Sequence, residues 1–141
     1  MSVRSVRPQP LICATDVEAS SRWYQQLLGV RSDHGGPNYE RLVDGDRLVM
    51  QLHNFDVEHN HGRIGQPDDR PYGNGVLLWF EVDDFDAVVN RGMQMGVDVV
   101  MAPHRNPPEG EPGGPAHREF WVRDPDGYTV VVASPDGEDP L

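Results

Sequence analysis

The stretch that decides the fold is HREFWVRDPDGYTVVVA, residues 117–133. It contains two strand-like runs, residues 117–123 and 128–132, joined by the sequence DPDG. Side chains of the first run alternate between two faces, and the second run is rich in β-branched residues, as pleated strands require. Pro125 fixes φ in the turn and Gly127 tolerates positive φ, so the stretch predicts a β-hairpin. One face of its first strand presents His117, Glu119, Trp121 and Arg123.

Composition excludes several classes of partner. The chain has 141 residues, which is the size of one ordinary domain. Its 12 Lys and Arg against 23 Asp and Glu give a net charge of −11, which repels nucleic acid and anionic membrane surfaces. Cys13 is the only cysteine and the N-terminus has no apolar signal segment, so we expect a cytoplasmic protein. No segment approaches the roughly 20 apolar residues of a membrane span.

Working outward from the hairpin, the pattern alternates strands with two helices. The sequence TDVE at residues 15–18 predicts a capping box with Thr15 as the N-cap, and the acidic residues Asp83, Asp84 and Asp86 predict a second helix start. Gly29 and Gly96 follow the helical patterns as stops. The expected strands are residues 10–14, 39–43, 47–53, 75–82, 97–101, 117–123 and 128–132, and the expected loops are 54–74 and 103–115.

The two halves of the chain repeat each other. ATDVEA at residues 14–19 aligns with VDDFDA at 82–87, and GV at 29–30 aligns with GV at 96–97. An internal repeat of this length indicates two copies of one supersecondary unit. Each copy is expected to contain a strand, a helix and three further strands.

The repeat and the segment REFWVRDPDGY resemble the vicinal oxygen chelate superfamily, which includes glyoxalases, extradiol dioxygenases, fosfomycin-resistance enzymes and bleomycin-binding proteins. The resemblance covers about residues 6–134. It implies a single α+β domain in which two tandem βαβββ modules form a curved mixed sheet with an open ligand cleft. Module one is expected at about 6–53, the connecting loop at 54–74 and module two at about 75–134. The resemblance also implies a homodimer.

In that superfamily a metal, where present, is bound by side chains from the first and last strands of each module. The resemblance places these positions near Gln9, Gln51, Leu77 and Val131. Two of the four side chains are aliphatic, and a divalent ion prefers His, carboxylate or thiolate ligands. We therefore expect no metal and no other cofactor.

Without a metal, the predicted site is a cleft lined by the alternating side chains of the strands that face inward. Its expected character is apolar and aromatic, which suits flat, largely apolar ligands held by stacking and burial. The predicted ligand-binding residues are Leu11, Cys13, Tyr39, Val49, Gln51, His53, Leu77, Trp79, Glu119, Trp121 and Val131.

Three functional hypotheses follow. The favoured one is a drug-binding protein of the bleomycin-resistance type, which sequesters an aromatic antibiotic such as bleomycin or an enediyne without chemistry and has no catalytic residues. The second is a metal-dependent lyase, isomerase or dioxygenase whose divalent metal would be bound by His53, His59, His61 or Glu119. The third is a metal-free enzyme, for which the sequence shows no catalytic base and orienting group at a spacing that would indicate catalysis.

Overall fold

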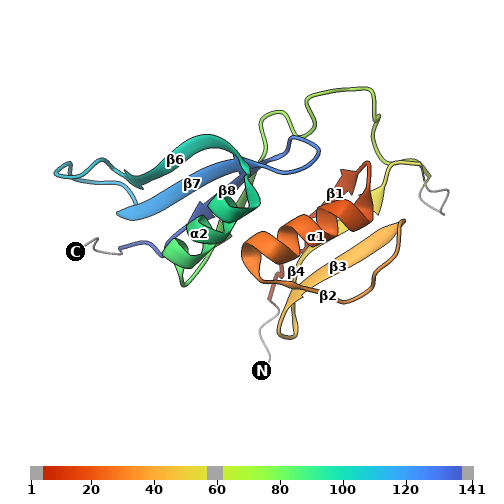
Figure 1. Cartoon of the computed structure of the whole chain (residues 1–141), viewed down its shortest axis with the longest axis horizontal. Coiled ribbons are helices and arrows are strands. Elements are labelled where there is room, and N and C mark those ends of the chain that lie inside the picture. The colour runs from red at the N-terminus through yellow and green to blue at the C-terminus, as the bar shows by residue number, and fades with distance from the viewer. Residues whose placement is uncertain (1–4, 57–61, 138–141) are drawn as a thin grey trace. The chain divides into compact units, whose positions relative to one another are not determined.

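The computed structural model describes residues 5–56 and 62–137 and contains two βαβββ units (Figure 1). The elements are β1 (Leu11–Ala14), α1 (Val17–Leu28), β2 (Arg31–Ser32), β3 (Tyr39–Asp44), β4 (Arg47–Asn54), β5 (Leu77–Glu81), α2 (Phe85–Met95), β6 (Asp98–Asn106), β7 (His117–Arg123) and β8 (Thr129–Ala133). The predicted α+β class and the tandem repeat are thereby confirmed. The second strand of the first repeat, absent from the list of expected strands, is the two-residue β2.

The chain divides into two compact units. The first comprises Met1–Gln25 and Gly29–Pro67, and the second comprises Gln26–Leu28 and Asp68–Leu141. From here on, module one and module two denote these two units and not the bounds predicted from the sequence, and each is described by itself.

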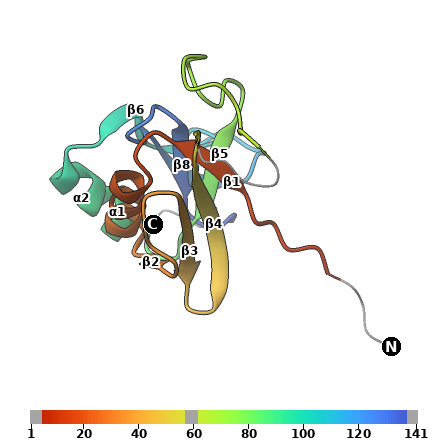
Figure 2. The same cartoon turned by 90° about the vertical axis from the view of Figure 1, so that its right-hand side faces the viewer.

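Module one is a mixed sheet of order β1-β4-β3-β2 with α1 on one face, as Figure 2 shows for β3 and β4. β1 runs parallel to β4, and the other pairs are antiparallel. The helix side of the sheet holds the buried side chains of Met50 and Leu52. It also holds Glu40, whose carboxylate accepts a hydrogen bond of 2.7 Å from Ser21 on α1.

Glu40 is a buried acid that sequence patterning did not single out. Its carboxylate also accepts hydrogen bonds from the hydroxyl of Ser32 and the backbone amides of His34, Gly35 and Arg41. Burial alone would raise the pKa of Glu40, but these hydrogen bonds outweigh it and the pKa is lowered. The charged carboxylate thus joins α1 to the sheet.

Module two is a mixed sheet of order β5-β8-β7-β6, and Figure 1 shows α2 beside β8. The face of this sheet under α2 is apolar and buried. Its largest fully buried side chain is Phe120. Arg118 at its margin lies 4.7 Å from the Phe85 ring and forms a 2.9 Å ion pair with Asp86. Other buried side chains of this face are Leu78, Val122, Val130 and Val132.

The predicted helix starts need one correction. The N-cap of α1 is Asp16, whose carboxylate accepts a hydrogen bond from the amide of Ala19, and not Thr15. Asp84 caps α2 in the same way through the amide of Ala87. A carboxylate at the N-cap satisfies a free amide and also faces the positive end of the helix, which favours Asp over the preceding residue. The glycine stops at Gly29 and Gly96 are both left-handed, as predicted.

β6 is longer than predicted. It runs from Asp98 to Asn106, so Pro103 and the residues up to Asn106 belong to a strand rather than to the expected loop. β6 is an edge strand, and its register with β7 shifts between Val99 and Met101 and again between Met101 and His104. A proline is tolerated at such a place because edge strands and bulges leave backbone amides unpaired.

The DPDG hairpin forms as predicted. The Asp124 carboxylate accepts hydrogen bonds of 2.9 Å from the amide of Asp126 and 3.0 Å from that of Tyr128, and Gly127 has φ 91°. These bonds fix the end of the β7–β8 ribbon. Within residues 5–56 and 62–137, no helix is long and apolar enough to cross a membrane.

Candidate functional site

The sheet of module two has an open face on the side opposite α2. Strand register aligns one row of side chains across all four strands, in the order Trp79, Val131, Trp121 and Met101. Trp79 is 46% exposed and Met101 is 42% exposed, whereas Val131 is buried between the two tryptophans. This aromatic row is an apolar surface that is open to solvent, and its members Trp79, Val131 and Trp121, but not Met101, are among the residues that the sequence predicted to bind ligand.

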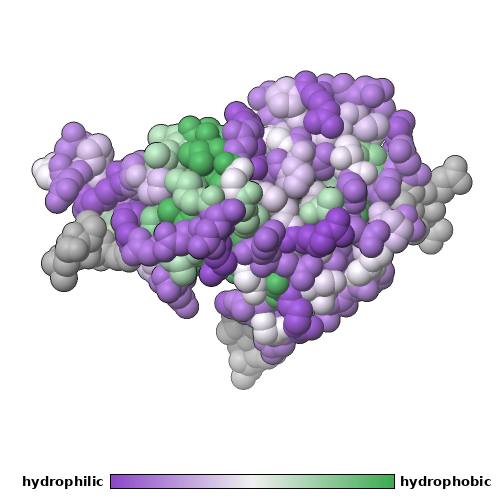
Figure 3. All heavy atoms as spheres, viewed as in Figure 1, coloured by the Kyte–Doolittle hydropathy of each residue, from purple (hydrophilic) through white to green (hydrophobic). Residues whose placement is uncertain are grey.

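Apolar side chains also reach the surface elsewhere in module two. Figure 3 shows hydrophobic residues gathered around β6, where Val99, Val100 and Met101 are all at least 38% exposed. Leu77, one row from Trp79 on β5, is 43% exposed. Exposed apolar groups that lie together mark binding surfaces more often than isolated ones do.

A buried polar network borders the aromatic row. The Glu119 carboxylate, 2% exposed, accepts hydrogen bonds from the Trp121 indole (2.8 Å), the Asn106 amide (2.9 Å) and His117 Nε2 (2.6 Å). His117 Nδ1 in turn lies 2.8 Å from the Asp136 carboxylate. The indole of Trp121 is therefore oriented by a fully bonded carboxylate.

The charges of this network stabilise each other. Burial alone would raise the pKa of Glu119, but hydrogen bonds from Asn106, His117 and Trp121 lower it below its ordinary value. Burial alone would lower the pKa of His117, but Glu119 and Asp136 raise it above its ordinary value. The network therefore favours a protonated His117 between two carboxylates. A histidine bonded at both nitrogens is fixed in place, which suits a structural role.

Sequence reasoning named Glu119 and Trp121 as ligand contacts and missed the other members of the network. The network includes His117, Asn106 and Asp136, and none of these was a predicted site residue. The alternation of β7 places His117 and Glu119 on one face, which is the signal that could have suggested the pair. No local signal connects either residue to Asp136, which lies beyond β8.

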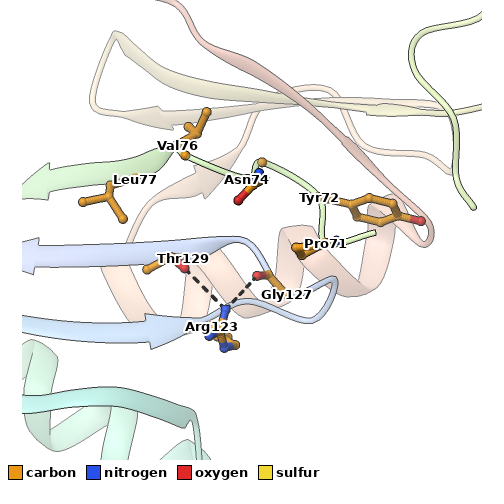
Figure 4. Close-up of a pocket in the computed structure, with 10 residues that line it drawn as sticks. Pro71, Tyr72, Asn74, Val76, Leu77, Arg123, Gly127 and Thr129 are labelled. Atoms are coloured by element: carbon orange, nitrogen blue, oxygen red, sulfur yellow. Dashed lines mark hydrogen bonds between the residues drawn. The ribbon is translucent and has the colours of Figure 1, made fainter. Parts of the chain in front are cut away.

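A pocket lies at one end of the open face of module two (Figure 4). It has a volume of about 340 Å³. Its walls are the loop from Pro71 to Leu77 and the end of the β7–β8 ribbon, with Arg123, Gly127 and Thr129 on the ribbon side. This pocket lies outside the predicted set of ligand-binding residues except for Leu77.

The remaining predicted residues lie in module one, on the sheet face opposite α1. Register aligns Leu11 with Gln51, and Cys13 with His53 and Tyr39. The Tyr39 hydroxyl donates to the Gln51 side-chain oxygen, and the Gln51 amide donates to the Gln9 carbonyl at 3.0 Å. Register therefore places these side chains on one face, with polar groups already bonded to one another.

Cys13 and His53 are buried, and Val49 lies where the pairing of two strands is irregular. Cys13 donates to the Ile64 carbonyl at 3.5 Å, and burial raises the pKa of its thiol. His53 is 5% exposed, with Nδ1 2.7 Å from the Asn54 carbonyl. Val49 is half-buried where the β3–β4 register shifts. A thiol with a raised pKa has less of the reactive thiolate form, which disfavours a nucleophilic role for Cys13.

The four positions that the family resemblance assigns to metal do not fit a metal. Leu77 and Val131 have no donor atom, and the only side-chain oxygen of Gln51 accepts from Tyr39. Within the described part of the chain, no group of three or more His, Cys, Asp or Glu side chains could hold a metal ion. His59 and His61, the alternative ligands, lie outside the described residues.

Three solved structures show the same fold at low identity. A protein from the mobile metagenome of V. Pseudocholerae is 20% identical with a TM-score of 0.67, over 95% of this chain and 97% of that one. A lactoylglutathione lyase from Agrobacterium tumefaciens is 18% identical with a TM-score of 0.65, over 94% and 96%. TioX from Micromonospora sp. ML1 is 17% identical with a TM-score of 0.61, over 96% and 99%.

Family assignment rests on the sequence as well as on the fold. Comparison with curated proteins gave no significant match. A family model described as Glyoxalase/Bleomycin resistance protein/Dioxygenase superfamily matches residues 8–132, which is most of the chain. The chain therefore belongs to the glyoxalase/bleomycin resistance protein/dioxygenase superfamily.

Proposed function

We propose that this protein binds a flat, largely apolar natural product, such as a bleomycin- or enediyne-type antibiotic, and sequesters it without chemical change. The observation that supports this most is the aromatic row of module two, where Trp79 and Met101 are exposed and Trp121 is held by Glu119. Aromatic side chains contribute large contact areas at little entropic cost, and pre-oriented ones lose least on binding.

The chemistry of the site supports binding more than catalysis. The polar side chains beside the aromatic row are engaged with one another, as in the contacts of Glu119 with His117 and Asn106. A general acid must donate a proton to a ligand and a general base must accept one from it, whereas the two nitrogens of His117 both face carboxylates. Resistance by sequestration requires only affinity, which the open apolar face can provide.

The function is tested by titrating a panel of aromatic antibiotics into the full chain and following tryptophan fluorescence. Ligand is then recovered after prolonged incubation and its mass is measured. Saturable binding with unaltered ligand supports sequestration. A recovered ligand of changed mass would show that the protein is an enzyme.

The first prediction concerns metal. The purified protein is expected to contain no stoichiometric divalent metal and to keep its thermal stability in a chelator, because Leu77 and Val131 occupy two of the four family positions. Elemental analysis and thermal denaturation with and without chelator measure this. About one Zn, Ni, Mn or Fe per chain would contradict it and favour the metal-dependent alternative with His53, His59, His61 or Glu119.

The second prediction is a homodimer whose interface helps to form the ligand sites. Support comes from the exposed apolar residues of β6, since contiguous exposed apolar surface marks interaction sites. Sedimentation velocity over a micromolar concentration series should give a mass of twice 15.8 kDa. A monomer that still binds ligand with full affinity would contradict the prediction.

A further inference from the structure

Arg123 forms no ion pair with a carboxylate among the residues that the structure describes, although half of the arginines of the chain do. Six arginines form ion pairs with aspartates, and these are Arg31, Arg41, Arg47, Arg63, Arg70 and Arg118. Among the described residues none forms an ion pair with Arg123. Its Nη1 makes only long contacts, 3.4 Å to the Gly127 carbonyl and 3.5 Å to the Thr129 hydroxyl.

The nearby carboxylates are engaged elsewhere or are too distant. Asp124 accepts from the amides of Asp126 and Tyr128, and Asp126 lies 4.0 Å from Arg70. Asp98 is the register partner of Arg123 across β6 and β7, but the two form no ion pair. The guanidinium of Arg123 therefore makes only long, weak hydrogen bonds to the described residues.

This cation lines the pocket at the end of the open face. Figure 4 shows Arg123 and Thr129 on the ribbon side, with the Asn74 side chain extending from the opposite loop. The pocket thus combines a guanidinium, a hydroxyl and an amide around a volume of about 340 Å³. Guanidinium and hydroxyl donors in one pocket suit an anionic oxygen group.

The loop that forms the other wall is fixed to the hairpin. The Tyr72 ring packs 5.8 Å from the Tyr128 ring, and the Arg70 guanidinium lies 4.3 Å above Tyr72. A Cβ added at Gly73, which has φ 66°, would come within 2.8 Å of Tyr128. This close approach and the left-handed backbone both require glycine there. These contacts fix this wall of the pocket against the hairpin.

The pocket and the aromatic row belong to the same sheet face. Register aligns Leu77 with Thr129 and Arg123, and this row lies two residues from the row of Trp79, Val131 and Trp121. Two residues along a strand span about 7 Å, which is close to the length of a fused two-ring aromatic system. One molecule could therefore lie on the aromatic row and place a substituent against Arg123.

We propose that the ligand of this protein has an anionic carboxylate or phosphate group, which the pocket of Arg123, Thr129 and Asn74 binds while its aromatic part lies on the row of Trp79 and Trp121. This inference rests on the proposed aromatic binding and narrows the ligand to aromatic natural products that carry such an anionic group. A net charge of −11 disfavours anions at long range, so recognition depends on the local guanidinium. The site is therefore expected to select ligands by the position of their anionic group as well as by its charge.

The test compares three probes of one shape by isothermal titration calorimetry on the full chain. They are 2-naphthoate, 2-naphthyl phosphate and the neutral 2-naphthamide. At least one anion is expected to bind about 10-fold more tightly than the amide, because charge-assisted hydrogen bonds are strong but Arg123 is partly solvated. The tighter of the two anions identifies the group that the pocket recognises.

Substitutions at Arg123 test whether the preference for the anion arises at that residue. Arg123→Gln should reduce the preference for the anion to within about 2-fold, and affinity for the amide should stay unchanged. Arg123→Lys should retain only part of the preference, because it keeps the positive charge but loses the planar guanidinium. Arg22→Gln, an exposed change of the same charge on α1, is the matched control and should keep the preference.

The outcomes separate this inference from the proposed function. If the amide binds as tightly as both anions, or if Arg123→Gln keeps the preference, the inference is wrong and aromatic binding stands. If none of the three probes binds while an aromatic antibiotic does, the inference is wrong and the proposed function stands; if no antibiotic of the panel binds either, both are wrong.

Discussion

Glu119→Gln is expected to lower the free energy of unfolding by about 3 kcal/mol, because it removes one partner of a buried ion pair. The Glu119 carboxylate accepts from three donors, and His117 Nε2 is the closest at 2.6 Å. A glutamine amide would turn an N–H toward at least one of those donors. It would also leave the protonated His117 with Asp136 as its only carboxylate. Urea denaturation followed by circular dichroism measures the loss.

The matched control lies in the same row of the same sheet. Glu81 and Glu119 both pair with Ala133 of β8, but Glu81 is exposed. Glu81→Gln should change the stability by less than about 0.5 kcal/mol. Equal unfolding midpoints for the two variants would show that the buried network contributes nothing specific.

The stability difference between wild type and Glu119→Gln should also depend on pH. The pKa of Glu119 is lowered from 4.5, so its contribution is present above pH 4.5 and is lost as pH falls through the folded pKa. The pKa of His117 is raised from 6.5, so its contribution is complete below pH 6.5 and is lost as pH rises through the folded pKa. The difference should therefore be largest between pH 4.5 and 6.5 and should shrink on either side.

Sequence patterns predicted the elements of the fold because each pattern has a local physical cause. The repeat, the glycine stops and the DPDG turn depend on residues that are neighbours in sequence. The errors occurred where two local signals competed, as at Thr15 and Asp16, or where position in the sheet decides. Pro103 could join β6 only because that strand is at an edge. Nothing in the local sequence states which strand will be at an edge.

The candidate site was predictable in part for the same reason. Alternation places Trp79 and Trp121 on defined faces, and register then aligns them with Val131. Alternation cannot distinguish an exposed polar residue from a buried one that has found partners. Glu119 was predicted as a ligand contact, whereas the structure bonds its carboxylate to three donors. The sequence also does not show which arginines will find carboxylates, so the pocket at Arg123 required the structure.

The buried network and the binding surface meet at Trp121. Its indole N–H donates to Glu119 at 2.8 Å, so the ring orientation depends on that carboxylate. Trp79 has a different support, since its ring lies 5.7 Å from the His117 ring. Both aromatic rings of the row therefore contact the same polar network, which limits the rotamer freedom that ligand binding would otherwise have to remove.

Trp79→Ala is expected to weaken binding of an aromatic antibiotic by roughly 30- to 150-fold, which corresponds to about 2–3 kcal/mol. Stacking contributes about 0.5–1.5 kcal/mol beyond the apolar area that is lost. Trp79 is the better variant to test because it is 46% exposed and its removal leaves the core intact. Trp121→Ala should weaken binding to a similar extent but also frees a hydrogen-bond site on Glu119. Fluorescence titration with the remaining tryptophans, or calorimetry, measures both affinities.

Met93→Ala is the matched control for Trp79→Ala. Met93 is 52% exposed on α2, so its truncation also removes exposed apolar area from module two, but from the helix and not from the open face of the sheet. Affinity should then stay within about 2-fold of wild type if position, rather than total apolar surface, determines binding. Circular dichroism confirms that each variant is folded before affinities are compared. If Trp79→Ala and Met93→Ala bind the drug as wild type does, the aromatic row is not the binding surface and sequestration at module two is wrong.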